Sequence, residues 1–397
     1  MISKRTRDIS SFIVMDVLEK AHEMERAGIN IIHLEVGEPD FDTPPCVKEA
    51  ACKALEDGFT HYTHSLGIFE LREAICEYYQ QYYQVSIDPD QVIVTSGSSP
   101  AIFLAFSALL EKNDEVIISD PHYACYPNFI KFVDGKPVTI TVYEEDGFQY
   151  KPETIREKMG SKTKAVFINS PSNPTGNLLS ASRMQEIAAL AQGSQGPYVV
   201  SDEIYHGLVY EGKEHSILEF TDYAFVLNGF SKQFAMTGLR LGYVIAPKAF
   251  IRPMQKVHQN FFISANAMVQ KAGIAALKYA ADDVLRMKEI YNQRRKYIIR
   301  RLKEMGFGIT VEPTGAFYVF ANARHLSLDS YKLAFDILEK AHVGVAPGID
   351  FGKNGEGYLR FCYANSLENI KEGMVRLERY LNQTFTVPNH ESNPTET

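Results

Sequence analysis

Seven short apolar runs between residues 90 and 250 constrain the fold of this chain more than any other feature. The runs are rich in β-branched residues and apolar on both faces, as expected for strands buried within a mainly parallel sheet. Helix-like segments at 101–112 and 182–192 separate some of them, which predicts an α/β fold. We expect the last run to be antiparallel, because a loop precedes it. The runs are QVIVTS, EVIISD, VTITVY, KAVFINS, YVVSDE, AFVLNG and GYVIA.

The length of 397 residues exceeds what one hydrophobic core usually serves, so we expect two domains. Residues 282–306 predict one long helix, because their apolar positions recur at helical spacing. We expect a large domain over 45–285, with a seven-stranded, mostly parallel sheet flanked by helices. A smaller α+β domain then combines both chain termini, 1–44 and 286–385. The polar segment 386–397 predicts a disordered tail.

Composition excludes several classes of protein. The formal net charge of −8 argues against a nucleic-acid partner, which would require a basic face. The five cysteines form no Cys-x-x-Cys pair, which predicts free thiols in a reducing compartment and no metal site. No apolar run approaches the roughly 20 residues of a membrane span. We therefore expect a soluble, cytoplasmic protein with no membrane partner.

Polar residues follow each run at its carboxyl end, where open parallel sheets bind their ligands. Gly97, Ser98 and Ser99 lie between a strand and a helix. Free amides at a helix N-terminus bind phosphate or carboxylate, and glycine allows a close approach of the backbone. An ordinary helix N-cap with serine would explain the same residues. The segment lacks the Gly-Lys-Ser/Thr ending of a Walker loop.

Asp202 ends another strand, and Tyr205 follows it three residues later. A carboxylate among apolar residues is costly unless it is paired, and a protonated ring nitrogen of a cofactor is one suitable partner. Tyr205 would share its side if a helical turn began there. An N-cap aspartate beside a core tyrosine is the structural alternative. Asn173 lies in the turn NSPSNPTGN, which turn chemistry explains without a ligand.

Lys232 and Arg240 are two cations in the apolar, glycine-punctuated segment NGFSKQFAMTGLRLGYVIA. A lysine near apolar groups and another cation titrates low enough to attack a carbonyl carbon as a neutral amine. Arg240 is suited to a bidentate contact with phosphate. A snorkelling lysine and a surface arginine are the alternative interpretation.

Taken together, the motifs resemble those of fold-type-I, pyridoxal-phosphate-dependent aminotransferases of class I/II, close to the aspartate and aromatic subgroup. The resemblance covers nearly the whole chain. Its segments are LEVGEPDFDTPP, HYTHSLGIFELREAI, SPSNPTGN, SDEIY, SKQFAMTGLRLGY, GAFYVF and LRFCYANS.

The resemblance implies pyridoxal 5′-phosphate as cofactor and assigns roles around its ring. Lys232 resembles the lysine that binds the cofactor covalently and later shuttles the substrate proton. Asp202 would keep the ring nitrogen protonated. Tyr205 and Asn173 would hydrogen-bond the ring oxygen, and Tyr123 would stack on the ring.

The same resemblance assigns residues to the cofactor phosphate and to the substrate. Arg360 would grip the substrate carboxylate, with Gly37 and Asn173 beside it. Tyr62 resembles the tyrosine that reaches the cofactor of the neighbouring subunit, which implies a homodimer with sites at its interface. The residues implied around the phosphate are Ser98, Ser99, Ser231 and Arg240.

Two departures from the family pattern concern the phosphate and the substrate side chain. Gly229 stands where the family often has serine, which predicts one phosphate contact fewer. The segment 257–270 lacks the arginine with which some aspartate enzymes bind a second carboxylate across the interface. Its Phe261, Phe262 and Met268 favour an apolar or aromatic side chain, although the absence does not exclude aspartate.

The predicted function is ping-pong transamination between an L-amino acid and a 2-oxo acid, with 2-oxoglutarate as the expected acceptor. Aspartate, an aromatic amino acid or another apolar amino acid would be the donor. One alternative keeps the cofactor and catalyses β-elimination, as cystathionine β-lyases do. A second is a non-catalytic regulator, but the roughly 35 residues before LEVGEPD are too few for a DNA-binding domain.

Overall fold

The computed structural model describes residues 2–191 and 196–385. Its largest element is a seven-stranded sheet with the order β2-β8-β7-β6-β5-β3-β4. β8 runs antiparallel to both of its neighbours, and the other pairs are parallel, so the predicted direction of the last run is confirmed. The strands are β2 (Val92–Thr95), β3 (Glu115–Asp120), β4 (Lys136–Thr141), β5 (Thr163–Asn169), β6 (Tyr198–Asp202), β7 (Ala224–Gly229) and β8 (Gly242–Ile245).

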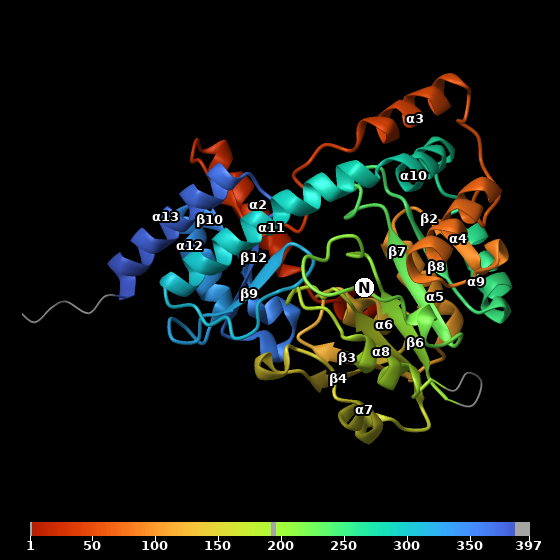
Figure 1. The fold of residues 1–397 in the computed structure, drawn as a ribbon. Coiled ribbons are helices and arrows are strands. Elements are labelled where there is room, and N and C mark those ends of the chain that lie inside the picture. The colour runs from red at the N-terminus through yellow and green to blue at the C-terminus, as the bar shows by residue number, and fades with distance from the viewer. Residues whose placement is uncertain (1, 192–195, 386–397) are drawn as a thin grey trace, which may run out of the picture.

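The central strands are buried on both faces. Successive side chains point to opposite sides of a strand, so neighbouring residues belong to different apolar clusters. Ile93 belongs to one apolar cluster, whereas Val92 and Val94 belong to another. Helices cover both faces and contribute further residues to these clusters, as the α/β pattern predicted (Figure 1). They are α3 (Pro45–Glu56), α4 (Phe69–Tyr83), α5 (Ser98–Leu109), α6 (Tyr126–Phe132), α7 (Pro152–Lys158), α8 (Ala181–Ala188), α9 (Lys248–Phe261) and α10 (Ala267–Tyr279).

A second body lies at the other end of α11, the long helix that crosses the molecule in Figure 1. It contains a three-stranded sheet, β11-β12-β9, and a two-stranded sheet, β1-β10. N-terminal α2 packs on C-terminal α12, so residues from both ends of the chain share this body. Its elements are α1 (Lys4–Arg7), α2 (Ile13–Arg26), β1 (Ile32–His33), α11 (Ala281–Glu304), β9 (Tyr318–Asn322), α12 (Ser330–Ala341), β10 (Val343–Gly344), β11 (Ala346–Pro347), β12 (Tyr358–Cys362) and α13 (Leu367–Phe385).

The predicted long helix is confirmed by α11, which ends two residues before Gly306. Gly306 adopts a φ of +90°, a conformation that favours glycine and suits a helix end. The domain boundaries at 44/45 and 285/286 stay a prediction, and 386–397 lies outside the described residues. Within the described part of the chain, no helix is both long enough and apolar enough to span a membrane.

Close backbone packing at Gly242 holds β8 against the loop that follows β2. A Cβ atom at this position would lie 2.6 Å from the carbonyl carbon of Gly97 and 2.7 Å from the amide nitrogen of Ser98. Both neighbours are backbone atoms, so a side chain at 242 would force the two segments apart.

We expect Gly242→Ala to destabilise the protein by about 1 to 3 kcal/mol, the usual cost of overpacking a rigid site. The thermal unfolding midpoint measures this as a decrease of several degrees. Gly238→Ala is the matched control, because a Cβ there meets nothing within 4 Å. Equal midpoints for the two variants would contradict the packing argument.

Candidate active site

A cavity of about 420 Å³ lies where the carboxyl ends of the parallel strands face the second body. Loops after β3, β5, β6 and β7 supply one wall, and β9, β12, α2 and the segment after β1 supply the other. Apart from Tyr62, every predicted site residue lines it. They are Gly37, Ser98, Ser99, Tyr123, Asn173, Asp202, Tyr205, Ser231, Lys232, Arg240 and Arg360.

Asp202 is a buried carboxylate at the end of β6. Tyr126 donates its hydroxyl to Oδ2 at 2.8 Å, and the amide of Ile204 donates to Oδ1 at 3.2 Å. Burial raises the pKa of Asp202 to about 6, although these hydrogen bonds and the nearby Lys232 favour the ionised form. A cationic ligand group would therefore find a partly desolvated carboxylate here.

Lys232 lies in the turn after β7, with its ammonium group in the cavity. Nζ donates to the carbonyl oxygen of Gly37 at 2.7 Å and lies 5.9 Å from the centre of the Phe317 ring. Burial lowers the pKa of Lys232 to about 8, and the positive charges of Arg360 and Arg240 act in the same direction. About a tenth of the side chain is thus a neutral, nucleophilic amine at pH 7, and about half at pH 8.

The N-terminus of α5 forms the anion-binding end of the cavity. Gly97 precedes it with a φ of +95°, and a Cβ there would lie 2.6 Å from Nη2 of Arg240. The absence of a side chain therefore lets the guanidinium group reach the helix amides. Ser98, Ser99 and Ser231 add hydroxyl groups. This arrangement suits a phosphate.

Arg360 on β12 is 2% exposed and forms the cationic end of the opposite wall. Its Nη1 donates to Oδ1 of Asn173 at 2.9 Å, and Nη2 donates to the carbonyl oxygen of Glu35. Its Nε has no hydrogen-bond partner among the described residues. An unpartnered donor on a buried guanidinium group is suited to a carboxylate ligand.

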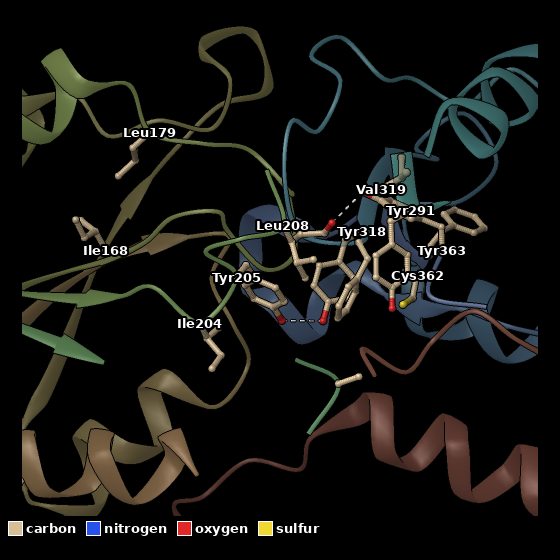
Figure 2. Close-up of a cluster of buried hydrophobic side chains, with 14 of the residues drawn as sticks. Ile168, Leu179, Ile204, Tyr205, Leu208, Tyr291, Tyr318, Val319, Cys362 and Tyr363 are labelled. Atoms are coloured by element: carbon tan, nitrogen blue, oxygen red, sulfur yellow. Dashed lines mark hydrogen bonds between the residues drawn. The ribbon is translucent and has the colours of Figure 1, made fainter. Parts of the chain in front are cut away.

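Two tyrosines connect the wall formed by the loops of the large sheet with the wall formed by β9 and β12. The hydroxyls of Tyr205 and Tyr318 lie 2.8 Å apart, as Figure 2 shows. Tyr205 lies in a turn, not in the helical turn that the sequence suggested, because the Asp202 carboxylate accepts the Ile204 amide and closes the backbone locally. Tyr123 packs edge-on against Tyr126 at 5.2 Å between ring centres.

Sequence reasoning missed several residues of this cavity. Tyr318 occurs inside the quoted motif GAFYVF, and Tyr126 follows Tyr123 by three residues. Nothing in the spacing of either tyrosine distinguished it from a core aromatic residue. α2 and the residue before it contribute an apolar side of the cavity, which the helical period of SFIVMDVL indicates only as a buried face. These apolar residues are Phe12, Val14, Met15 and Leu18.

Other predicted residues lie elsewhere in this chain. Tyr62 is 81% exposed and lines a second cavity of about 480 Å³, together with Ser96 and Met268. Phe261 is exposed. Phe262 packs at the edge of an apolar cluster. A partner subunit would be needed to bring any of them to a cofactor.

Gly229 has a packing reason. It pairs with Gly242 across β7 and β8, and a Cβ there would lie 3.0 Å from the carbonyl oxygen of Leu241. The space of a serine side chain is therefore occupied by the neighbouring strand, and Ser231 lines the cavity instead.

The residues present fit pyridoxal phosphate. The cavity combines an anion-binding helix end, a lysine with a lowered pKa and a buried carboxylate, which match a phosphate, an aldehyde and a ring nitrogen. Aromatic side chains lie between these polar ends. Among the described residues, no group of histidine, cysteine, aspartate or glutamate side chains could hold a metal ion.

Comparison with known proteins agrees with this chemistry. The model of the family described as aminotransferase class I and II matches residues 29–377. An aspartate aminotransferase of Pyrococcus horikoshii is 43% identical over 96% of this chain and 97% of its own. A (5-formylfuran-3-yl)methyl phosphate transaminase of Methanocaldococcus jannaschii is 42% identical over 96% of this chain and all of its own.

Solved structures show the same fold. Aspartate aminotransferase from Thermus thermophilus with maleate has a TM-score of 0.91 and 37% identity, covering 96% of this chain and 99% of that one. The chain therefore belongs to the class I and II aminotransferases, whose members with this fold depend on pyridoxal phosphate. It catalyses pyridoxal-phosphate-dependent transamination of small molecules, and the β-lyase alternative is not favoured.

The buried carboxylate generates a prediction for the cofactor-free protein. Because the folded-state pKa of Asp202 is raised from 3.8 to about 6, the wild type loses stability as pH rises through this window. Asp202→Asn removes the buried charge at nearly constant shape. We expect its free energy of unfolding to exceed that of the wild type by about 3 kcal/mol at pH 8 and by about half of that at pH 5.

Denaturant unfolding of the two cofactor-free proteins at both pH values measures this difference. Asp222→Asn serves as control, because Asp222 is exposed and its replacement should have little effect at either pH. A pH-independent difference for Asp202→Asn would contradict the assigned cost of burying this charge.

Proposed function

We propose that this chain transfers the amino group of an L-amino acid with an apolar or aromatic side chain to 2-oxoglutarate, in two half-reactions at one site. The observation that carries the proposal is one cavity that is lined by both Lys232 and Arg360 and by an apolar wall. Both half-reactions need an amine, a carboxylate site and space for a side chain.

Lys232 is the residue that attaches the cofactor and moves the proton. Its lowered pKa makes a neutral Nζ available to accept a proton from the substrate α-carbon and to return it. When bound, pyridoxal phosphate supplies the electron sink and carries the amino group between substrates. The hydrogen bond from Nζ to the carbonyl oxygen of Gly37 holds the amine next to the substrate-facing wall.

The other residues bind and orient. Asp202 keeps a proton on the ring nitrogen, and its hydrogen bond from Tyr126 fixes the carboxylate in place. Tyr205 and Asn173 would donate to the ring oxygen of the bound cofactor, while Tyr123 would stack on its ring. The phosphate is held by Ser98, Ser99, Ser231 and Arg240.

Arg360 and Gly37 select an α-carboxylate. The contacts of Arg360 with Asn173 and with the carbonyl oxygen of Glu35 orient the guanidinium group before substrate arrives. Gly37 lines the same wall, and its lack of a side chain leaves room for the Tyr318 hydroxyl. Preorganised donors lose little entropy on binding, so the site favours a planar carboxylate over other anions.

The apolar wall supports an apolar or aromatic donor. Phe12, Val14, Met15 and Leu18 lie on one side of the cavity, and Ile102 contributes from α5. The three cations that line the cavity, Lys232, Arg240 and Arg360, all have other proposed partners. Names of relatives include aspartate, aromatic-amino-acid and aspartate/prephenate aminotransferases, so aspartate is the competing donor.

We also infer a homodimer with its sites at the interface. Tyr62 is exposed beside Ser96, which immediately precedes the phosphate-binding loop. An exposed tyrosine in this place suits the cofactor phosphate of a second copy. We infer that the two domains divide at 44/45 and 285/286. We also infer a cytoplasmic location, in keeping with the five free cysteines.

Lys232→Ala should abolish multiple turnover, because no other amine lines the cavity in the described part of the chain. The measurement is oxo-acid formation from an amino acid and 2-oxoglutarate with added cofactor. Lys248→Ala is the control, since Lys248 is exposed and pairs only with Asp88. Wild-type turnover by Lys232→Ala would refute the proposed mechanism.

A half-reaction screen tests the donor. The cofactor-loaded protein is mixed with each amino acid in the absence of an oxo acid, and loss of the lysine-bound absorbance is followed. For each amino acid we compare the ratio of the half-reaction rate constant to the dissociation constant. We expect this ratio to be higher for phenylalanine, tyrosine and leucine than for aspartate. A faster reaction with aspartate would show that an anionic side chain is accepted and would contradict the donor class.

A further inference from the structure

Tyr318 connects the two walls of the cavity through a single hydroxyl group. It is the first residue of β9, whereas Tyr205 belongs to the turn after β6 in the seven-stranded sheet. Their hydroxyl oxygens lie 2.8 Å apart, and the dashed line in Figure 2 marks this contact. The two rings pack edge-on, with 5.7 Å between their centres. Within the described residues, the Tyr205 hydroxyl has no other hydrogen-bond partner.

The ring of Tyr318 also supports Arg360. Cys362 pairs with Tyr318 and Arg360 pairs with Phe320, so Tyr318 and Arg360 share one face of the three-stranded sheet. The guanidinium carbon lies 4.4 Å from the centre of the Tyr318 ring, within the range of a cation–π contact. One side chain therefore touches both the tyrosine proposed for the cofactor and the arginine proposed for the substrate.

Gly37 provides the space for this hydroxyl. A Cβ atom at position 37 would lie 1.9 Å from the Tyr318 oxygen, so even alanine would displace it. The φ of Gly37 is not in the left-handed region, and the steric requirement alone accounts for glycine here. The hydroxyl of Tyr318 is thus confined between Gly37 and Tyr205.

The direction of the hydrogen bond between Tyr205 and Tyr318 determines whether the Tyr205 hydroxyl can donate a hydrogen bond into the cavity. Each hydroxyl has one proton, and either oxygen can act as the donor. If Tyr318 donates, the proton of Tyr205 is free to point into the cavity. Donation to a hydroxyl also strengthens that hydroxyl as a donor, because hydrogen bonds in a chain polarise one another.

We propose that Tyr318 is a positioning residue with two separable contributions. Its hydroxyl donates to Tyr205 and strengthens the hydrogen bond from Tyr205 to the cofactor ring oxygen, while its ring holds Arg360 in place for the substrate carboxylate. The inference rests on the proposed function, in particular on the role of Tyr205.

Tyr318→Phe isolates the hydroxyl, because the ring and its contact with Arg360 remain. A weaker hydrogen bond to the ring oxygen leaves more negative charge near the cofactor's attachment to lysine, so that the bound cofactor holds its proton more tightly. Spectrophotometric pH titration of the bound cofactor, without substrate, should show an upward shift of its apparent pKa by roughly half a unit. The KM for the amino acid should change less than about twofold.

Tyr318→Leu removes the ring as well, so KM should rise roughly tenfold in addition to the titration shift. Tyr363→Phe is the matched control. Tyr363 is also fully buried and follows β12, but its hydroxyl donates to the carbonyl oxygen of Ala316 at 3.2 Å. Neither the titration nor the KM should change in this variant.

Gly37→Ala tests the same contact without altering Tyr318. A Cβ at position 37 would also lie 2.8 Å from Cζ of Tyr318, so the substitution displaces the ring as well as the hydroxyl. Gly37→Ala should therefore shift the cofactor titration upward and raise KM, and its titration shift should not add to that of Tyr318→Phe, since the two residues are in contact. Wild-type titration curves for both Tyr318→Phe and Gly37→Ala would overturn the inference. Absence of any cofactor-dependent absorbance in the wild type would instead contradict the proposed function itself.

Discussion

The parallel register of β5, β6 and β7 is the constraint on which the rest of the site depends. Asn169 pairs with Asp202 across β5 and β6, so both strands end at the same level. The amide of Asn169 then ties the two turns together: Nδ2 donates to the carbonyl oxygen of Asp202 at 2.9 Å, and Oδ1 accepts from the amide of Asn173 at 2.8 Å. A shift of one residue would turn Asp202 away from the cavity.

Loss of water gives this edge of the sheet its chemistry. Burial raises the pKa of Asp202 and lowers the pKa of Lys232, so the two values approach neutral pH from opposite directions. Proton transfer is most efficient when donor and acceptor have pKa values near the working pH. The second body supplies Tyr318, Arg360 and residues of α2 to the cavity lining, so it forms part of the environment of these groups.

The sequence predicted what depends on local pattern. Strands buried in the sheet are apolar throughout, so most of β2 to β8 were visible as runs, although the edge strand β4 is partly exposed. Lys232 and Asp202 stood out as charges in apolar company, whereas Arg360 was assigned only through the family resemblance. Tyr318 was not visible, because its importance comes from a hydroxyl contact with a residue more than a hundred positions away. The turn at Tyr205 includes a hydrogen bond from the Ile204 amide to the Asp202 carboxylate. Hydrophobic periodicity carries no information about such a bond.

α2 packs outside the sheet that carries the reacting groups, yet it faces their cavity. Val14 packs in the apolar cluster that contains Phe320 and Phe351, whereas Met15 and Leu18 line the cavity outside that cluster. Replacements at Met15 and Leu18 would therefore change the shape of the cavity while Lys232, Asp202 and Arg360 keep their contacts.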